Sequence, residues 1–268
     1  MHIESVKLAF FSPTGTSRTI IQEVANGIGL NNTELLDLTR PDARDKALHA
    51  SERDLLVVAV PVYSGRVPEI LLAWLNAVEA NNTPTVCIAV YGNRAFEDAL
   101  LELSDVLVQR GCLPVAAAAF IGEHSFSSDK TPIAVARPDA ADLDQADLFG
   151  RRVGELLQSA QSLEGVELAV PGNRPYRERS PGGAAAFIAV GDKCLQCGVC
   201  AEACPSGAID PDYQEPDDAA KCIHCCACIK VCPEHARSML PGRAMEVAQR
   251  LADTCRDRKE PEFFFPAV

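Results

Sequence analysis

The chain has 268 residues, of which 47% are hydrophobic and 23% charged, an ordinary balance for folded proteins that excludes global disorder. Its formal net charge of −12 argues against nucleic acid as the main ligand, whereas an acidic surface suits basic protein partners. No apolar run reaches the roughly 18 residues that span a bilayer, and residues 1–4 lack the features of an export signal. We therefore expect a cytoplasmic protein without a membrane partner, and its oligomeric state stays open.

Residues 1–160 alternate short apolar runs with amphipathic stretches. The runs predict strands at 6–11, 35–38, 55–60, 85–90 and 114–120, and apolar residues at helical spacing predict helices at 20–28, 70–78, 96–109 and 140–157. Alternation of this kind indicates right-handed crossovers and a parallel sheet. We therefore expect one α/β domain over residues 1–160.

The remainder of the chain has a different composition. Residues 161–185 are rich in proline, glycine and arginine, which is typical of a linker. Residues 186–240 hold eight of the twelve cysteines and predict a second, small domain. Residues 241–268 contain a predicted helix at 244–255 and the apolar run Phe263–Phe265, which we expect to pack back onto a domain surface.

The cysteines form an internal repeat. The pattern C-x2-C-x2-C-x3-C-P begins at Cys194 and recurs 28 residues later at Cys222. Without an export signal, such clustering favours metal ligation over disulfides. The doubled pattern resembles bacterial ferredoxins with two [4Fe–4S] clusters, in which the fourth cysteine of each motif ligates the other cluster. Zinc bound by closed sets of four thiolates is the alternative, but it does not require the doubled four-cysteine run.

The ferredoxin resemblance implies an α+β domain with two ligand sets. Cluster I would be held by Cys194, Cys197, Cys200 and Cys232, and cluster II by Cys222, Cys225, Cys228 and Cys204. Cys226 stands where the first motif has Gly198, and it is either a swapped ligand or, as we favour, a free buried thiol. His224 and His235 either tune cluster II by hydrogen bonding or are surface histidines. The remaining cysteines, Cys87, Cys112 and Cys255, are expected to be inert.

A loop of small hydroxyl residues follows the first predicted strand. It reads Ser12, Pro13, Thr14, Gly15, Thr16 and Ser17, and the helix after it offers unpaired N–H groups that suit a phosphate. The chain has neither a Walker lysine nor a G-x-G-x-x-G pattern here. The loop resembles the phosphate-binding loop of flavodoxins, which implies FMN bound to a doubly wound sheet of five parallel strands in the order 2-1-3-4-5.

Two further loops at carboxyl ends of strands strengthen the flavodoxin resemblance. The first contains Pro61, Val62, Tyr63, Ser64 and Gly65, which the resemblance places over one flavin face, with a flexible peptide at Gly65 near N5. The second contains Tyr91, Gly92, Asn93 and Phe96. By that resemblance Asn93 meets the pyrimidine edge, Phe96 stacks on the ring, and Tyr63 or Tyr91 covers another face. The alternative is that these aromatic residues only pack in the core.

A last loop, residues 122–128, follows the fifth strand at the same sheet edge, and His124 within it borders the flavin, faces the second domain or is an ordinary loop histidine. With residues 136–139 and both cysteine motifs, these loops make the chain resemble flavodoxin–ferredoxin fusions often called EFR1 family ferredoxins. The resemblance implies electron transfer between FMN and two [4Fe–4S] clusters, with redox proteins as partners.

Two other functions stay open. The first is a reductase that reduces a quinone or nitro compound at the flavin, with His124 or Arg94 as contacts. The second is a protein-binding module that has lost FMN. No acid–base pair or nucleophile stands out, so we assign no catalytic residue.

Overall fold

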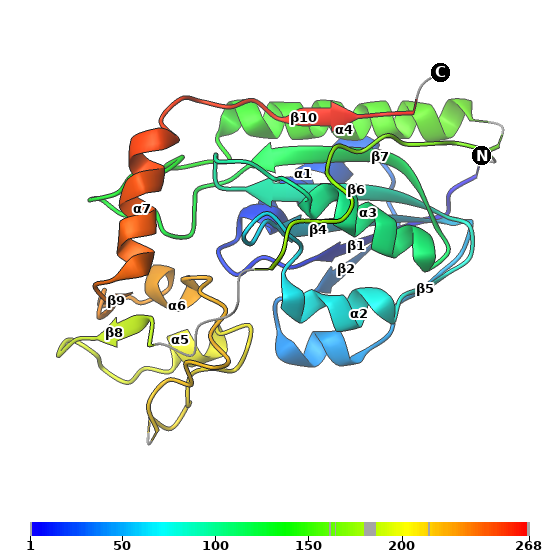
Figure 1. Cartoon of the computed structure of the whole chain (residues 1–268). Helices are drawn as coiled ribbons and strands as arrows, with labels where there is room; N and C mark the ends of the chain where they lie inside the picture. The colour runs from blue at the N-terminus through cyan, green and yellow to red at the C-terminus, as the bar shows by residue number, and fades with distance from the viewer. Residues whose placement is uncertain (1, 161, 164, 180–185, 214, 267–268) are drawn as a thin grey trace.

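The computed structural model describes residues 2–160, 162–163, 165–179, 186–213 and 215–266 (Figure 1). Its centre is a six-stranded sheet in the order β10-β7-β6-β4-β1-β2. The five strands β1 (Ser5–Phe10), β2 (Thr33–Asp37), β4 (Asp54–Pro61), β6 (Thr83–Tyr91) and β7 (Cys112–Ile121) are parallel. Taken in chain order, these five have the arrangement 2-1-3-4-5, so the fold is flavodoxin-like, as predicted.

Helices cover both faces of this sheet. The helices α1 (Thr16–Ile28) and α4 (Ala140–Ser159) pack on one face through Ile20, Val24 and Phe149. On the other face lie the 3-10 helix η2 (Glu69–Leu71), α2 (Leu72–Asn76) and α3 (Ala99–Gln109). Because both faces are covered, β4 and β6 are almost completely buried, which explains their unbroken apolar sequences. Smaller elements at the rim are η1 (Pro41–Asp45), β3 (His49–Ala50) and β5 (Glu79–Ala80).

The chain returns to this sheet at its C-terminal end. The strand β10 (Glu262–Phe264) pairs antiparallel with β7, and Figure 1 shows it along the sheet edge. Successive side chains of a strand point to opposite faces, so Phe263 joins the core beneath α1 and α4, whereas Phe264 packs against the opposite core. The prediction that this apolar run packs onto a domain surface is confirmed, and the structure adds that it extends the sheet.

The cysteine-rich segment forms a small unit beside the carboxyl edge of the sheet. It contains β8 (Ile188–Val190), α5 (Val199–Glu202), α6 (Ala227–Lys230) and β9 (Arg237–Met239), with β8 and β9 antiparallel. Helix α7 (Arg243–Thr254) then leads back toward the sheet and packs Leu251 against Ile133. In the part of the chain that the structure describes, no helix has the length and apolarity needed to cross a membrane.

Residues 173–179 of the predicted linker are bound to the acidic side of α3. The carboxylate of Asp98 accepts hydrogen bonds from the backbone N–H groups of Asn173, at 2.8 Å, and Arg177, at 2.7 Å. Glu102, one turn further along, accepts from the guanidinium groups of Arg66 and Arg179. This segment is therefore fastened to the larger domain. Residues 161, 164 and 180–185 of the predicted linker lie outside the described residues.

Candidate functional site

The hydroxyl-rich loop lies between β1 and the first turn of α1. Gly15 precedes the helix with a φ of 88° and has no side chain to cap it, and of the first-turn N–H groups that of Arg18 donates to the Ser12 hydroxyl at 3.0 Å. The first turn carries no acidic residue, and the hydroxyl of Ser17 is buried without a hydrogen-bond partner among the described residues. Unpaired N–H groups and an unpartnered hydroxyl at a helix N-terminus suit an anion such as a phosphate monoester. The residues present therefore fit the phosphate of FMN.

A cleft at the carboxyl ends of the strands joins all four of the predicted loops. Ten predicted FMN residues line it: Ser12, Thr14, Thr16, Ser17, Pro61, Val62, Tyr63, Tyr91, Gly92 and His124. It also includes Val90, which the prediction missed, and four residues of the predicted loops that were not assigned to FMN, namely Pro13, Gly122, Glu123 and Ser125. The cleft volume of about 50 Å³ is well below the roughly 300–1,000 Å³ of typical ligand pockets. Lining side chains must therefore move when a three-ring flavin enters.

His124 has a closely packed position in this cleft. Its ring lies over Gly92, where a β-carbon would approach His124 Cδ2 to 2.3 Å. The Nδ1 atom accepts a hydrogen bond of 3.0 Å from the backbone N–H of Phe126. Burial, with the nearby positive charges of Arg94 and Lys230, lowers the pKa of His124 to about 4. The ring is therefore neutral near pH 7 and carries its proton on Nε2, where it can serve as a donor.

The remaining predicted FMN residues do not line the cleft. Asn93 is buried, and its amide Nδ2 donates to the carbonyl oxygens of Cys255, at 2.8 Å, and Asp257, at 2.9 Å. Phe96 packs in the core, with ring centroids 5.6 Å from Tyr91 and 6.3 Å from Phe264. Asn93 thus fastens the chain after α7, and Phe96 supports the core beneath β10. Both roles depend on the C-terminal return of the chain.

Gly15, Ser64 and Gly65 also lie outside the cleft lining. Ser64 and Gly65 form the tip of a tight turn, closed by backbone hydrogen bonds between Tyr63 and Arg66. The carbonyl of Gly65 accepts a hydrogen bond of 3.0 Å from the N–H of Asp98. The turn tip is thus held by α3, and the peptide that the flavodoxin resemblance assigns to N5 is engaged elsewhere.

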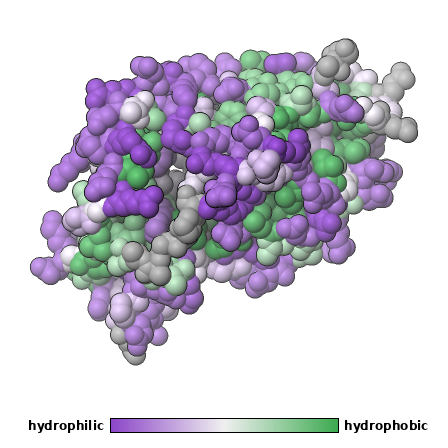
Figure 2. Space-filling model, in the orientation of Figure 1, coloured by the Kyte–Doolittle hydropathy of each residue, from purple (hydrophilic) through white to green (hydrophobic). Residues whose placement is uncertain are grey.

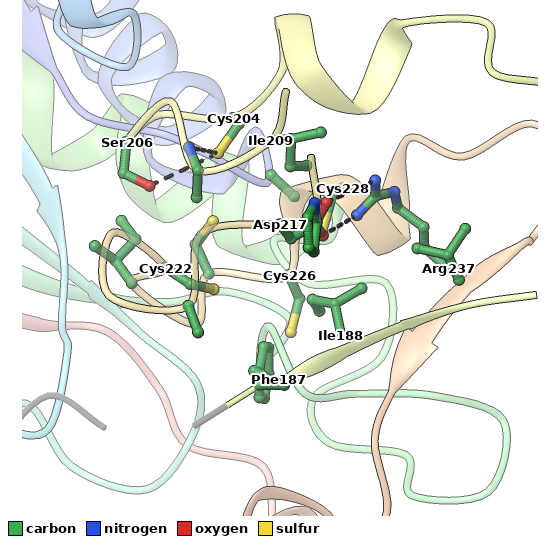
Figure 3. Close-up of a pocket in the computed structure, with 18 of the residues that line it drawn as sticks. Phe187, Ile188, Cys204, Ser206, Ile209, Asp217, Cys222, Cys226, Cys228 and Arg237 are labelled. Atoms are coloured by element: carbon green, nitrogen blue, oxygen red, sulfur yellow. Dashed lines mark hydrogen bonds and ion pairs between the residues drawn. The ribbon is translucent and has the colours of Figure 1, made fainter. Parts of the chain in front are cut away.

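The cysteines of the second motif other than Cys232 line a cavity of about 400 Å³ in the small unit (Figure 3). Its lining includes Cys222, Cys225, Cys228 and, from the first motif, Cys204, which together make the predicted cluster II set. The Cys204 thiol also contributes to the raised pKa values of these three cysteines, after burial, which is the main cause. Among the described residues no three potential ligands close around a single-ion position, and the cavity is far larger than one ion.

The cysteines of the predicted cluster I set are more dispersed. Cys194 belongs to the same cavity, Cys200 is buried, and Cys197 is exposed. Cys200 Sγ lies 3.4 Å from the hydroxyl of Tyr213, a neighbour that the sequence analysis missed. The fourth member, Cys232, accepts a hydrogen bond of 3.3 Å from Ala236 N, and Cys204 accepts an equivalent bond from Ala208 N. Free thiols in this arrangement suit iron–sulfur ligation, because thiolates are the ligands of such clusters.

The repeat extends to the backbone of the two motifs. Three pairs of residues 28 positions apart have a left-handed φ: Gln196 and His224, Gly198 and Cys226, Gly207 and His235. Cys226 therefore adopts, at φ 59°, a conformation that the first motif assigns to glycine, and its thiol is buried. His224 lies in the sequence between Cys222 and Cys225 of the predicted cluster II set, and its Nε2 is buried without a partner among the described residues.

The cleft and the cysteine cavity meet at one packed interface. Tyr63 lines the cleft, and the thiols of Cys225 and Cys226 lie close enough to add to the burial that raises its pKa well above the usual value. A row of rings also connects the two regions. Consecutive ring centroids are 5.2 Å apart from His124 to Phe126, 5.8 Å to Phe187 and 4.3 Å to His224.

Charged groups add to this interface. The ammonium of Lys230, in α6, lies 3.0 Å from Glu123 Oε1 in the cleft lining and donates to the carbonyl of Ser127. In the first motif, the carbonyl of Pro205 accepts a hydrogen bond of 2.6 Å from Arg44, which belongs to η1 of the larger domain. The loop before α5 instead faces solvent, with Leu195 69% exposed, and Figure 2 shows apolar surface gathered over β8 and α5. The second motif thus contacts the cleft, whereas the first contacts the larger domain through Pro205 and exposes its loop before α5.

Comparison with known proteins supports the assignment of the small unit as an iron–sulfur domain. A family model described as a 4Fe–4S binding domain matches residues 190–210, which hold the first cysteine motif. The chain thus combines a flavodoxin-like domain with a ferredoxin-type segment. No curated protein matches the chain.

Solved structures of flavodoxins are similar to this chain over a little more than half of its length. Flavodoxin 2 from Bacillus cereus has a TM-score of 0.41 and 11% identity, covering 56% of this chain and 98% of its own. A flavodoxin from Streptococcus pneumoniae has a TM-score of 0.40 and 17% identity, covering 58% of this chain and 99% of its own. A flavodoxin, WrbA-like protein from Agrobacterium tumefaciens has a TM-score of 0.38 and 14% identity, covering 59% of this chain and 99% of its own.

Proposed function

We propose that the chain is an electron-transfer protein of the EFR1 type, which holds FMN in the cleft and two [4Fe–4S] clusters on the doubled cysteine motifs. FMN exchanges electrons singly or in pairs whereas each cluster exchanges one, so the bound groups would supply conversion between two-electron and one-electron chemistry. We propose Cys194, Cys197, Cys200 and Cys232 as ligands of one cluster, and Cys222, Cys225, Cys228 and Cys204 as ligands of the other.

The observation that carries this proposal is the interface between cleft and cavity. Tyr63 belongs to the cleft and lies within electrostatic range of the Cys225 and Cys226 thiols. The row of rings from His124 to His224 spans the same boundary through consecutive ring contacts. Two sites on one chain already have a high effective concentration toward each other, and here their walls are in contact. Contact between the two walls favours a short separation between the bound groups, which direct electron exchange requires.

The cleft residues have assignable tasks. The N-terminus of α1 and the Ser17 hydroxyl would bind the phosphate, and neutral His124 would offer a donor without placing a second charge beside the flavin. The interface also favours electron transfer over reduction of a small substrate, because Lys230 of the small unit binds Glu123 at the cleft wall. A small-molecule reductase would need open space there. We propose basic redox proteins as partners, since the chain carries a net charge of −12.

The experiment begins with iron, sulfide and flavin counts on protein reconstituted under anaerobic conditions, where eight iron atoms and one FMN per chain are expected. Thr16→Glu sets a carboxylate against the phosphate and should abolish FMN retention while leaving cluster absorption intact. Thr19→Glu is the matched control, because Thr19 is exposed on the next turn of α1 outside the cleft lining. Full FMN affinity in Thr16→Glu would refute the site.

The cross-ligation needs a separate experiment. Cys204→Ala should remove the electron paramagnetic resonance signal of the second-motif cluster, although Cys204 belongs to the first motif. Cys226→Ala is the control and should retain both signals. Loss of only the first-motif signal in Cys204→Ala, or zinc in place of iron, would contradict the proposed ligand sets.

A further inference from the structure

The two cysteine motifs differ at one buried position of the cavity. The first motif continues from Cys204 to Ile209, and the second continues over the same number of residues from Cys232 to Arg237. Both Ile209 and Arg237 line the cavity. A guanidinium therefore occupies the place that the repeat assigns to an apolar side chain.

Arg237 is unusually buried for a charged residue. Its side chain is 2% exposed, and its two terminal nitrogens form an ion pair with Asp217, at 2.5 Å and 3.2 Å. Nε is buried and has no hydrogen-bond partner among the described residues. Burial of a charge is costly unless another group compensates it, and Asp217 occupies only part of the donor capacity of the guanidinium.

The cysteine sulfurs lie within electrostatic reach of this guanidinium. Arg237 counteracts the rise that burial imposes on the pKa of Cys228, and it helps lower the pKa of Cys232. Its own pKa is raised by Asp217 and by the thiols of Cys200 and Cys228, against the effect of burial. These cysteines belong to both proposed ligand sets. Figure 3 shows the guanidinium reaching toward Asp217 beside Cys228.

We propose that Arg237 is the buried counter-charge of the thiolate cavity and raises the reduction potential of the iron–sulfur centre it faces. The inference rests on the proposed function, since it needs clusters on these cysteines. Thiolate ligation brings negative charge into the cavity, and one added electron makes the centre more negative by one unit with no bond made or broken. A fixed positive charge nearby stabilises the reduced form more than the oxidised form.

Asp217 does not cancel this charge completely. Its side chain is 28% exposed whereas that of Arg237 is 2% exposed, so water screens the carboxylate more strongly than the guanidinium. At Cys228 the lowering effect of Arg237 on the pKa exceeds the raising effect of Asp217, so the part of the cavity around this sulfur experiences a net positive field from the pair. Removing either partner should shift the potential, and the two shifts should have opposite signs.

The test is a dithionite titration of holoprotein under anaerobic conditions, monitored by electron paramagnetic resonance, with iron and sulfide counted in each sample. Arg237→Gln should make one cluster at least tenfold harder to reduce at a fixed applied potential, which corresponds to about 59 mV for a one-electron couple. Asp217→Asn should make the same cluster easier to reduce. Arg237→Lys keeps the positive charge and should have a potential close to that of the wild-type protein. It also keeps the inference testable if Arg237→Gln folds poorly.

The matched control is Lys221→Gln, since Lys221 precedes a cluster cysteine but is exposed, and its removal should have a much smaller effect. Clusters present with unchanged potentials, or shifts of the same sign in Arg237→Gln and Asp217→Asn, would overturn the inference and indicate a structural role. Absence of iron and sulfide from the wild-type protein would instead overturn the proposed function itself.

Discussion

The substitution Asn93→Asp tests whether Asn93 fastens the C-terminal return or contacts the flavin. The change is isosteric and keeps a side chain that tolerates the left-handed φ of 62°. It removes both hydrogen bonds to the carbonyls of Cys255 and Asp257, worth about 0.5–1.5 kcal/mol each. It also buries a carboxyl group against two carbonyl oxygens, which disfavours its ionisation.

The electrostatic penalty can be worked out from linkage. The introduced carboxyl ionises in a detached segment near pH 4, and each unit by which burial raises its pKa costs about 1.4 kcal/mol once the pH exceeds the raised value. A rise of one or two units, added to the two lost hydrogen bonds, gives about 2–6 kcal/mol near pH 7. The introduced carboxyl has a higher pKa in the folded protein than in the detached segment. The loss of stability should therefore shrink as the pH falls toward 5 and the buried carboxyl becomes protonated.

The assay is hydrogen exchange of the holoprotein, followed by mass spectrometry of peptides covering residues 256–265. A loss of about 3 kcal/mol predicts exchange on the order of a hundredfold faster near pH 7, with a smaller acceleration at pH 5. Asn32→Asp is the control, because its exposed amide also donates to a backbone carbonyl, of Glu4. Unchanged protection of these peptides together with weakened FMN binding would refute the structural role and restore the flavin contact predicted for Asn93.

Four further predictions concern single side chains. Burial lowers the pKa of His124 from its ordinary 6.5 to about 4. The free energy of unfolding should therefore fall by up to about 3 kcal/mol as the pH drops from 7 to 4. Thermal unfolding at several pH values should show that this loss is absent from His124→Asn. Glu102→Gln should destabilise the protein by about 3 kcal/mol, because two guanidinium groups lose their buried carboxylate. It should also speed tryptic cleavage within residues 173–179, whereas the exposed control Glu155→Gln should not. Phe263→Ala should cost about 2–4 kcal/mol in denaturant unfolding, since its ring lies 5.0 Å and 5.7 Å from two core phenylalanine rings; an unchanged midpoint would contradict this packing. Cys226→Gly should change stability by less than about 1 kcal/mol, because glycine relieves the strain of the left-handed φ but removes a buried thiol. The iron content should stay unchanged, and a loss of iron would instead identify Cys226 as a ligand.

The sequence alone was sufficient for the main sheet because its information is local. Five apolar runs alternate with amphipathic stretches, and each observed parallel strand overlaps a predicted run within a few residues. The cysteine repeat is equally local, since its spacing is set by one tight loop per motif, and the 28-residue period appears again in the left-handed backbone positions. The region from Glu69 to Asn76 was less accurately predicted, because a 3-10 turn after Pro68 leaves only a short α-helix.

Tertiary structure decided what depends on segments distant in the chain. Asn93 and Phe96 follow a strand at the expected edge, yet the return through α7 and β10 occupies the amide and covers the ring. Sequence spacing also could not reveal that Arg237 forms an ion pair with Asp217. Nor could it show that the second motif, rather than the first, lies against the cleft. Local pattern thus determined which elements and ligand types exist. Long-range packing, which has no signature in neighbouring residues, determined which of them face each other.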